Sequence, residues 1–159
     1  MNIEHRSVIL LKAVMAALFL VLLVFQFLSF PGQFAYNSQQ HPDQAYLQWP
    51  LTFLAGFCIL CAQVIVVSIW RLLSLVQSDR IFSNEAFKWV SAIIWAIAGG
   101  WTVLVSFTAW VLSQADDPGM PMVLIFLSLA VTVVGLLMVV MRALLRQATL
   151  LRSDLEGVI

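Results

Sequence analysis

The chain has 159 residues, of which 62% are hydrophobic and only 10% are charged, and its mean hydropathy is +0.99. Soluble domains are about 45–50% apolar and about 25% charged, so this composition excludes an ordinary water-soluble domain and indicates a membrane protein. The formal net charge is zero and no basic stripe is present, which argues against direct binding of nucleic acid.

Four apolar stretches are each long enough to cross a bilayer as an α-helix, which takes about 20 residues. We predict an all-α bundle of four transmembrane helices that forms a single membrane domain over residues 1–159, with spans at about 8–30, 51–75, 89–112 and 122–141. The remaining segments are predicted outer loops at 31–50 and 113–121, an inner loop at 76–88 and a tail at 142–159.

The basic residues predict the orientation of these spans. Short cytoplasmic loops of membrane proteins accumulate Lys and Arg, and this bias sets the topology. All eight basic residues lie toward the same side of the four spans: Arg6, Lys12, Arg71, Arg80, Lys88, Arg142, Arg146 and Arg152. We therefore predict a multi-pass protein of the cell (plasma) membrane with both termini in the cytoplasm.

The first span is expected to end at Pro31-Gly32, because proline interrupts helices. Its apolar run from Met15 to Phe30 is longer than the apolar region of a usual signal peptide, so we expect an uncleaved helix. Aromatic residues in the outer loop that follows favour the membrane interface, and a short helix is expected near Pro42–Gln48.

The second span contains a C-x-x-C pair, Cys58 and Cys61, on one face of the helix. A membrane thiol oxidant uses such a pair, but a reactive thiolate needs a nearby cation or similar activation, and no Lys, Arg or His is close in sequence. A second cysteine pair to relay electrons is absent as well. We interpret both residues as small helix-packing residues and expect no enzymatic activity, with thiol oxidation as the one enzymatic alternative.

The inner loop leads into the third span with a typical helix start. Ser83 is a predicted N-cap, and Glu85 in the first turn suits the positive end of the helix dipole. Trp89 and Trp110 lie near the two ends of the span, where tryptophan anchors helices at the membrane interface.

Small residues at a spacing of four occur within the third span, at Ala92, Ala96 and Gly100. Small residues allow helix backbones to approach closely, and packing of this kind drives helix association in lipid. We predict that this face packs against another span of the same chain, with a homo-oligomer through span three as the alternative.

The tail is predicted to continue the fourth span as an amphipathic cytoplasmic helix. Its apolar stripe, with spacings of three and four residues, consists of Leu144, Ala148, Leu151 and Leu155. Three arginines lie largely off the stripe: Arg142, Arg146 and Arg152. This arrangement suits either contact with lipid headgroups or docking of a cytoplasmic partner.

Polar residues within the spans are few and uncharged. No Asp or Glu lies within any span, which argues against proton-coupled export, since such transporters usually place a carboxylate in the membrane. Gln63, Thr102 and Thr108 are candidate buried polar residues that either bond a neighbouring helix or line a solute path. The two histidines, His5 and His41, lie on opposite sides, so neither a metal nor a haem nor another cofactor is expected.

Two segments carry a family resemblance, the inner loop with the helix start RIFSNEAFKWV and the tail MRALLRQATLLRSDLEGVI. With the four-span plan, they resemble the bacterial domain of unknown function 2975, a family of small membrane proteins. The resemblance implies no catalytic residues. It also implies a regulatory pair, because some members are encoded beside a small helix-turn-helix regulator.

The sequence thus predicts a non-enzymatic interaction or regulatory protein, whose inner loop and tail dock a cytoplasmic partner, with a helix-turn-helix regulator as one candidate. The alternatives are a small-solute transporter or channel-like component, with Gln63, Thr102 and Thr108 as polar lining, and an auxiliary subunit of a larger membrane complex. Under all of these interpretations, the four spans are embedded in the lipid bilayer, which is itself a partner of the protein.

Overall fold

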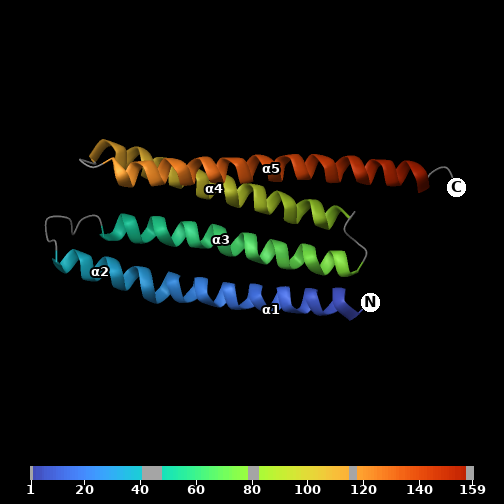
Figure 1. The fold of residues 1–159 in the computed structure, drawn as a ribbon, viewed down its shortest axis with the longest axis horizontal. Coiled ribbons are helices and arrows are strands. Elements are labelled where there is room, and N and C mark those ends of the chain that lie inside the picture. The colour runs from blue at the N-terminus through green and yellow to red at the C-terminus, as the bar shows by residue number, and fades with distance from the viewer. Residues whose placement is uncertain (1, 41–47, 79–82, 115–117, 157–159) are drawn as a thin grey trace. The chain divides into compact units, whose positions relative to one another are not determined.

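The computed structural model describes residues 2–40, 48–78, 83–114 and 118–156. The regular elements in these ranges are all helices, and no strand occurs within them, which confirms the predicted all-α class. The chain divides into two compact units, Met1–Trp70 and Arg71–Ile159, and Figure 1 shows the course of the helices in each.

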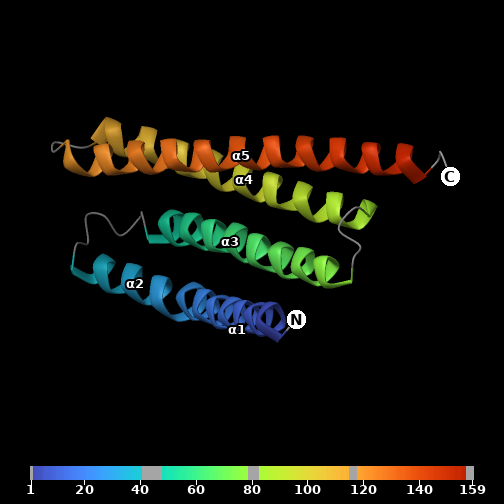
Figure 2. The same ribbon diagram turned by 45° about the vertical axis from the view of Figure 1, so that its right-hand side comes forward.

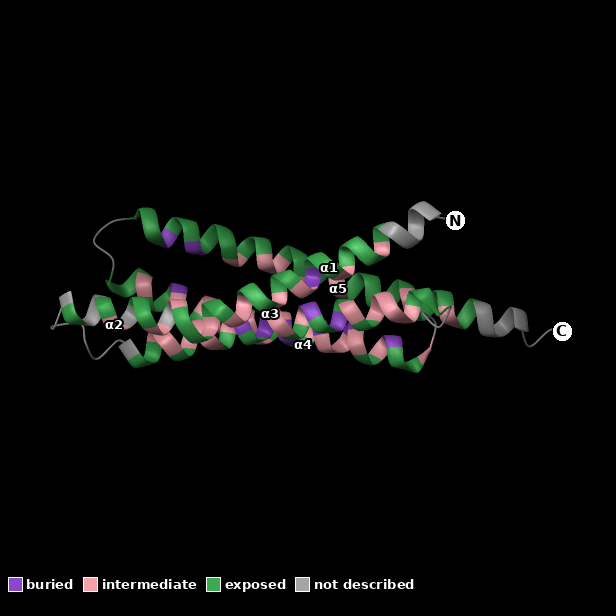
Figure 3. Cartoon of the chain, turned by 90° about the horizontal axis from the view of Figure 1, so that it is seen from below, coloured by how far each residue is buried: buried purple, intermediate pink, exposed green. Residues whose placement is uncertain are grey.

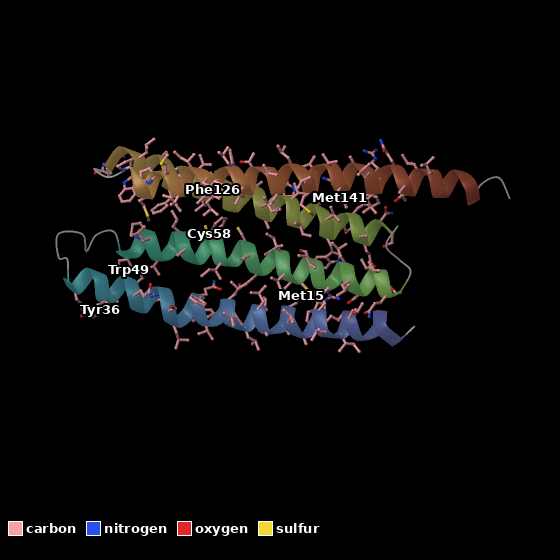
Figure 4. All side chains as sticks on the ribbon, in the orientation of Figure 1. Met15, Tyr36, Trp49, Cys58, Phe126 and Met141 are labelled. Carbon is pink, nitrogen blue, oxygen red and sulfur yellow. The ribbon has the colours of Figure 1, made fainter. Side chains whose placement is uncertain are left out.

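The first unit is built from a helical rod and a second helix that returns beside it. The rod runs without interruption through α1 (Asn2–Val24), the π-helical segment η1 (Phe25–Ser29) and α2 (Phe30–Gln40). The first part of α3 (Gln48–Gln77) runs antiparallel to the rod, as the two views in Figures 1 and 2 agree. Met15 is buried on the side of α1 that faces α3 (Figure 4).

The helix does not end at Pro31-Gly32, so that expectation is wrong. Proline lacks a backbone N–H and its ring crowds the carbonyl one turn earlier, so a helix that passes through proline must adjust. Within membranes, a local π-turn is one adjustment that satisfies the released backbone groups. The π-helical segment ends two residues before Pro31, and α2 then continues to Gln40. The short helix expected near Pro42–Gln48 falls almost wholly outside the described residues.

The second unit contains the end of α3 together with α4 (Asn84–Gln114) and α5 (Gly119–Glu156). The latter two helices form an antiparallel pair (Figures 1 and 2). Three contacts fix their register along the pair. Trp101 Nε1 donates a hydrogen bond to Thr132 Oγ1 at 2.9 Å, the hydroxyls of Thr108 and Ser128 lie 3.5 Å apart, and a Cβ atom on Gly135 would lie 3.3 Å from Ile97 Cγ2.

The fourth helix begins directly after Ser83, the predicted N-cap. The Ser83 carbonyl accepts a hydrogen bond from the Ala86 amide at 3.1 Å, as at the start of a helix, and Glu85 lies in the first turn. The Ser83 hydroxyl, however, is buried and bonds to no residue in the described part of the chain. The backbone of Ser83 therefore begins the helix, while its side chain does not cap it there.

Four helices are long and apolar enough to cross a membrane, which confirms the predicted four-span architecture: Ser7–Gln33, Trp49–Gln77, Asn84–Gln114 and Gly119–Leu151. An uninterrupted helix bonds its own backbone groups, which is what a segment in hydrocarbon requires. Most of their apolar side chains are exposed, as the green residues in Figure 3 show. In a bilayer this surface contacts lipid, where exposure of apolar side chains has no penalty.

The fifth helix is the longest, with 38 residues, and it passes through the predicted end of the fourth span without a break. At 1.5 Å per residue it is roughly 57 Å long, well beyond the ~30 Å hydrocarbon core. The prediction that the tail continues span four as one helix is therefore confirmed. Phe126 and Met141, both exposed, lie along its length in Figure 4.

Candidate functional site

The tail presents its apolar stripe on the side of α5 that faces away from α4. Gly135 marks the side that approaches α4, because a Cβ atom at this position would lie 3.3 Å from Ile97 Cγ2. Leu144, Ala148 and Leu151 follow Gly135 by nine, thirteen and sixteen residues, which at 3.6 residues per turn puts them roughly on the opposite side. All three are exposed, Leu144 at 53% and Leu151 at 66%.

The arginines of the tail occupy another face of α5. Arg142 and Arg146 follow Gly135 by seven and eleven residues, close to two and three full turns, so they lie near the α4 side, and both are exposed. The arginines and the stripe therefore lie on different faces of the helix. Arg152 and Leu155 belong to the helical part of α5, and their side chains lie outside the described ones.

The carboxyl-terminal end of α5 projects past the start of α4, as Figure 1 shows. Gly135 lies opposite Ile97 in the antiparallel pair. Thirteen residues before Ile97 is Asn84, the first residue of α4, and it therefore lies opposite Ala148, thirteen residues after Gly135. The residues of α5 after about Ala148 therefore have no part of α4 opposite them. This projecting segment contains Leu151, at the end of the described stripe.

A group of cations lies at one end of the second unit, and we call it the basic end: Arg71, Lys88, Arg142 and Arg146. The Arg71 guanidinium lies over the Trp89 ring, with its Cζ atom 5.7 Å from the ring centroid. In the antiparallel pair, Gly135 lies opposite Ile97. Trp89, eight residues before Ile97, therefore lies opposite Ala143, eight residues after Gly135. Arg142, the neighbour of Ala143, is thus at the level of Lys88 and Trp89.

A side-chain hydrogen bond inside the first unit joins α3 to the helical rod. Gln63 Nε2 on α3 donates a hydrogen bond of 2.8 Å to Gln26 Oε1. Gln26 lies within the π-helical segment η1, where an extra residue in the turn changes which side chains face a neighbour. Two neutral amides that bond each other satisfy part of their polar surface within an apolar environment, which is a packing role.

Two other candidate polar residues lie on α4 and differ in burial. Thr108 is buried, bonds back to the Leu104 carbonyl at 2.8 Å and lies beside the Ser128 hydroxyl. Thr102 is exposed on the surface of the helix pair. Its hydroxyl bonds the Ala98 carbonyl one turn earlier at 2.8 Å, which satisfies the donor without any neighbouring helix.

The small residues of the third span do not lie on the line of contact between α4 and α5. That line includes Ile97 and Trp101, whereas Ala92, Ala96 and Gly100 are centred about a quarter to a third of a turn away. Ala96 is buried, and the other two are half-buried. The close approach in this helix pair instead uses a small residue of α5.

Sequence reasoning did not find the role of this small residue, Gly135. It also did not find three side-chain pairs: Gln26–Gln63, Trp101–Thr132 and Arg71–Trp89. The sequence names several of these residues individually, but not their partners. A pairing depends on the register of two helices, and register is not readable when every helix is apolar on most faces. For Gly135, the available signal of a close helix contact was the presence of a glycine within a long apolar helix.

The cysteine pair lies on the side of α3 away from the first helical rod. Gln63 marks the side that faces the rod, and Cys58 and Cys61 are roughly 140° and 160° around the helix from it. Cys61 is buried and Cys58 is half-buried, and the two are not joined by a disulfide. Within the described ranges, no group of three or more His, Cys, Asp or Glu side chains could hold a metal ion.

Comparison with known proteins gives a match to a protein family. The model of the family described as "Protein of unknown function (DUF2975)" matches residues 32–159, which include α3, α4 and α5 in full. The match confirms the resemblance carried by the inner loop and the tail. No curated protein and no solved structure matches the chain.

Proposed function

The chain belongs to the DUF2975 family of proteins of unknown function, and from its own geometry we propose that it is a membrane-anchored interaction protein that docks a cytoplasmic regulator on its tail. The observation that carries this proposal is the exposed apolar stripe of α5, which reaches the projecting end of the helix at Leu151. The first partner class to test is a helix-turn-helix regulator, which the family resemblance implies.

The length of α5 supports the proposal. If residues 122–141 fill the hydrocarbon core, the fifteen residues from Arg142 to Glu156 extend roughly 22 Å further. The helix carries the stripe rigidly out of the core, because no break separates the tail from the span. A rigid extension presents its side chains in a fixed arrangement, which lowers the entropy lost on binding.

The pattern of the stripe also supports the proposal. Leu144, Ala148, Leu151 and Leu155 are spaced as the anchors of a helix that lies in an apolar groove. Exposed apolar surface outside the hydrocarbon core is unfavourable unless it is covered.

Photo-crosslinking in living cells tests the proposal at single positions. A photoreactive amino acid at Leu144 or Leu151 is expected to crosslink a soluble protein, whereas the same probe at Phe126, which is 75% exposed on the same helix, is expected to contact lipid only. Leu144→Ser with Leu151→Ser should abolish co-purification of the crosslinked protein. Gln147→Ser, also exposed on the tail but off the stripe, serves as the matched control.

Two results would contradict the proposal. In one, probes at Leu144 and Leu151 yield only lipid adducts, as the Phe126 probe does. In the other, the crosslinked protein still co-purifies with the chain truncated before Arg146. The first result would assign the stripe to the membrane surface, and the second would move the docking site to another part of the chain.

A further inference from the structure

We propose that the basic end of the second unit binds the phosphate headgroup of an anionic phospholipid, with Arg71, braced on Trp89, as the principal ligand. This site is separate from the apolar stripe of the tail and does not depend on a protein partner.

Arg71 lies within an apolar part of α3. It is six residues before the end of the helix, roughly 9 Å along the axis, and Leu72 and Leu73 follow it directly. A charged side chain near hydrocarbon is costly unless it reaches the interface or pairs with an opposite charge. The Arg71 side chain is exposed, so a group from the bilayer can reach it.

The contact with Trp89 holds the guanidinium without neutralising it. The Arg71 Cζ atom is 5.7 Å from the centroid of the ring, within the range of a cation–π interaction. Such a contact leaves the N–H donors of the guanidinium available, and their fork geometry fits phosphate oxygens. Tryptophan also prefers the headgroup level of a membrane, which is where lipid phosphates lie.

The charges at this level are mostly positive. Lys88 is the neighbour of Trp89, and the register of α4 and α5 brings Arg142 to the same level, with Arg146 one turn beyond. All three are exposed. Among the described charged side chains of this unit, Glu85 is acidic and the others are basic. Positive charge is therefore in excess there and attracts anionic lipid.

A lipid, as opposed to a soluble anion, is the occupant that fits the surroundings. The basic end adjoins long apolar helices whose outward side chains, including Met141 and Val140, are exposed and can contact acyl chains. A headgroup bound at Arg71 is tethered to such chains, so binding combines a charge-assisted contact with apolar burial. Soluble phosphate gains only the first of these.

The test uses the full chain, purified in a neutral detergent, and native mass spectrometry of retained lipids. Phosphatidylglycerol and phosphatidylcholine with identical acyl chains are titrated against the wild type and the variants. We expect preferential retention of phosphatidylglycerol. Arg71→Gln should reduce that retention about five-fold, as expected for one basic residue near an anionic surface, and leave phosphatidylcholine unchanged. Arg71→Lys should retain most of the preference.

Lys12→Gln is the matched control, because it removes the same charge from α1, outside the basic end. An equal loss with Lys12→Gln and Arg71→Gln would overturn the proposal in favour of diffuse attraction to every cation. Equal retention of the two lipids by the wild type would also overturn it. If glycerol phosphate alone displaced phosphatidylglycerol at equal concentration, the site would be one for soluble phosphate.

Folding of each variant is checked by circular dichroism and by elution as a single species. If the Arg71→Gln variant did not fold, the Arg142→Gln variant would replace it in the test, because Arg142 is exposed and lies at the same level of the second unit. Loss of phosphatidylglycerol retention in Arg142→Gln, beyond that in Lys12→Gln, is the expected result. Retention equal to wild type would overturn the assignment.

Discussion

A hydrogen bond between neutral side chains, Gln63 to Gln26, ties α3 to the first helical rod. Inside a membrane such a bond has no water to compete with it, although measured values remain modest at about 0.6–2 kcal/mol. Loss of one partner leaves the other amide with a donor or acceptor unsatisfied in apolar surroundings. The pair is therefore more sensitive to single than to double replacement.

We expect Gln63→Leu to lower the free energy of unfolding by about 1 kcal/mol, and Gln26→Leu to do the same. The double variant should be less destabilised than the sum of the two, because neither amide is then left unpaired. Unfolding in mixed micelles, followed by circular dichroism, measures all three. Strict additivity would mean that the two side chains do not interact.

Gly135 decides how closely α4 and α5 approach. A Cβ atom there would lie 3.3 Å from Ile97 Cγ2, closer than ordinary van der Waals contact, whereas a Cβ on Gly56 of α3 would meet nothing within 4 Å. The two glycines are therefore a matched pair, since both are in apolar helices and only one is confined by a neighbour.

Substitution by valine should affect stability differently at these two glycines. We expect Gly135→Val to lower the free energy of unfolding by about 1–3 kcal/mol more than Gly56→Val, because the added atoms must displace α4. The same unfolding assay in micelles gives the comparison. Equal effects of the two substitutions would show that the contact at Ile97 relaxes without cost.

At the scale of elements, the first rod combines a π-helical segment with a proline. The five residues of η1 come directly before α2, which contains Pro31 at its second position. A π-turn lengthens the hydrogen-bonded loop by one residue, so it can accommodate a carbonyl that has lost its usual donor. The irregular segment thus has a local cause in the sequence.

Pro31→Ala should restore the missing N–H and allow regular α-helix through this segment. We expect the free energy of unfolding to rise, by up to about 3 kcal/mol, which is the usual cost of proline inside a helix. Pro50 and Pro121 lie in the first turns of α3 and α5, where a missing N–H is not needed, so the alanine variants there should be near neutral. A destabilised Pro31→Ala protein would show that the irregular segment is required by its packing.

At the scale of the whole molecule, the four-span architecture follows from length and apolarity, while the orientation rests on the distribution of Lys and Arg. With both termini inside, Ser113 at the end of α4 should face the outside of the cell, and Ser78 after α3 should face the cytoplasm. These two exposed serines mark opposite ends of the spans.

Cysteine accessibility measures this orientation. In a background with Cys58→Ala and Cys61→Ala, Ser113→Cys should react with a membrane-impermeant maleimide in intact cells. Ser78→Cys should react only after the membrane is permeabilised. The reverse pattern would place the basic end, and with it the tail, outside the cell and would contradict docking of a cytoplasmic partner.

The sequence by itself determined the helical class, the four spans and the continuation of the tail, because a segment in a bilayer must bond its own backbone and its apolar length is directly readable. Only the tertiary structure decided which side chains meet: Gln63 with Gln26, Trp101 with Thr132, Gly135 with Ile97 and Arg71 with Trp89. It also showed that Thr102 is exposed and that the first helix passes Pro31. Helices that are apolar on most faces can contact lipid or one another at almost any rotation, so their register depends on packing and not on hydrophobic pattern.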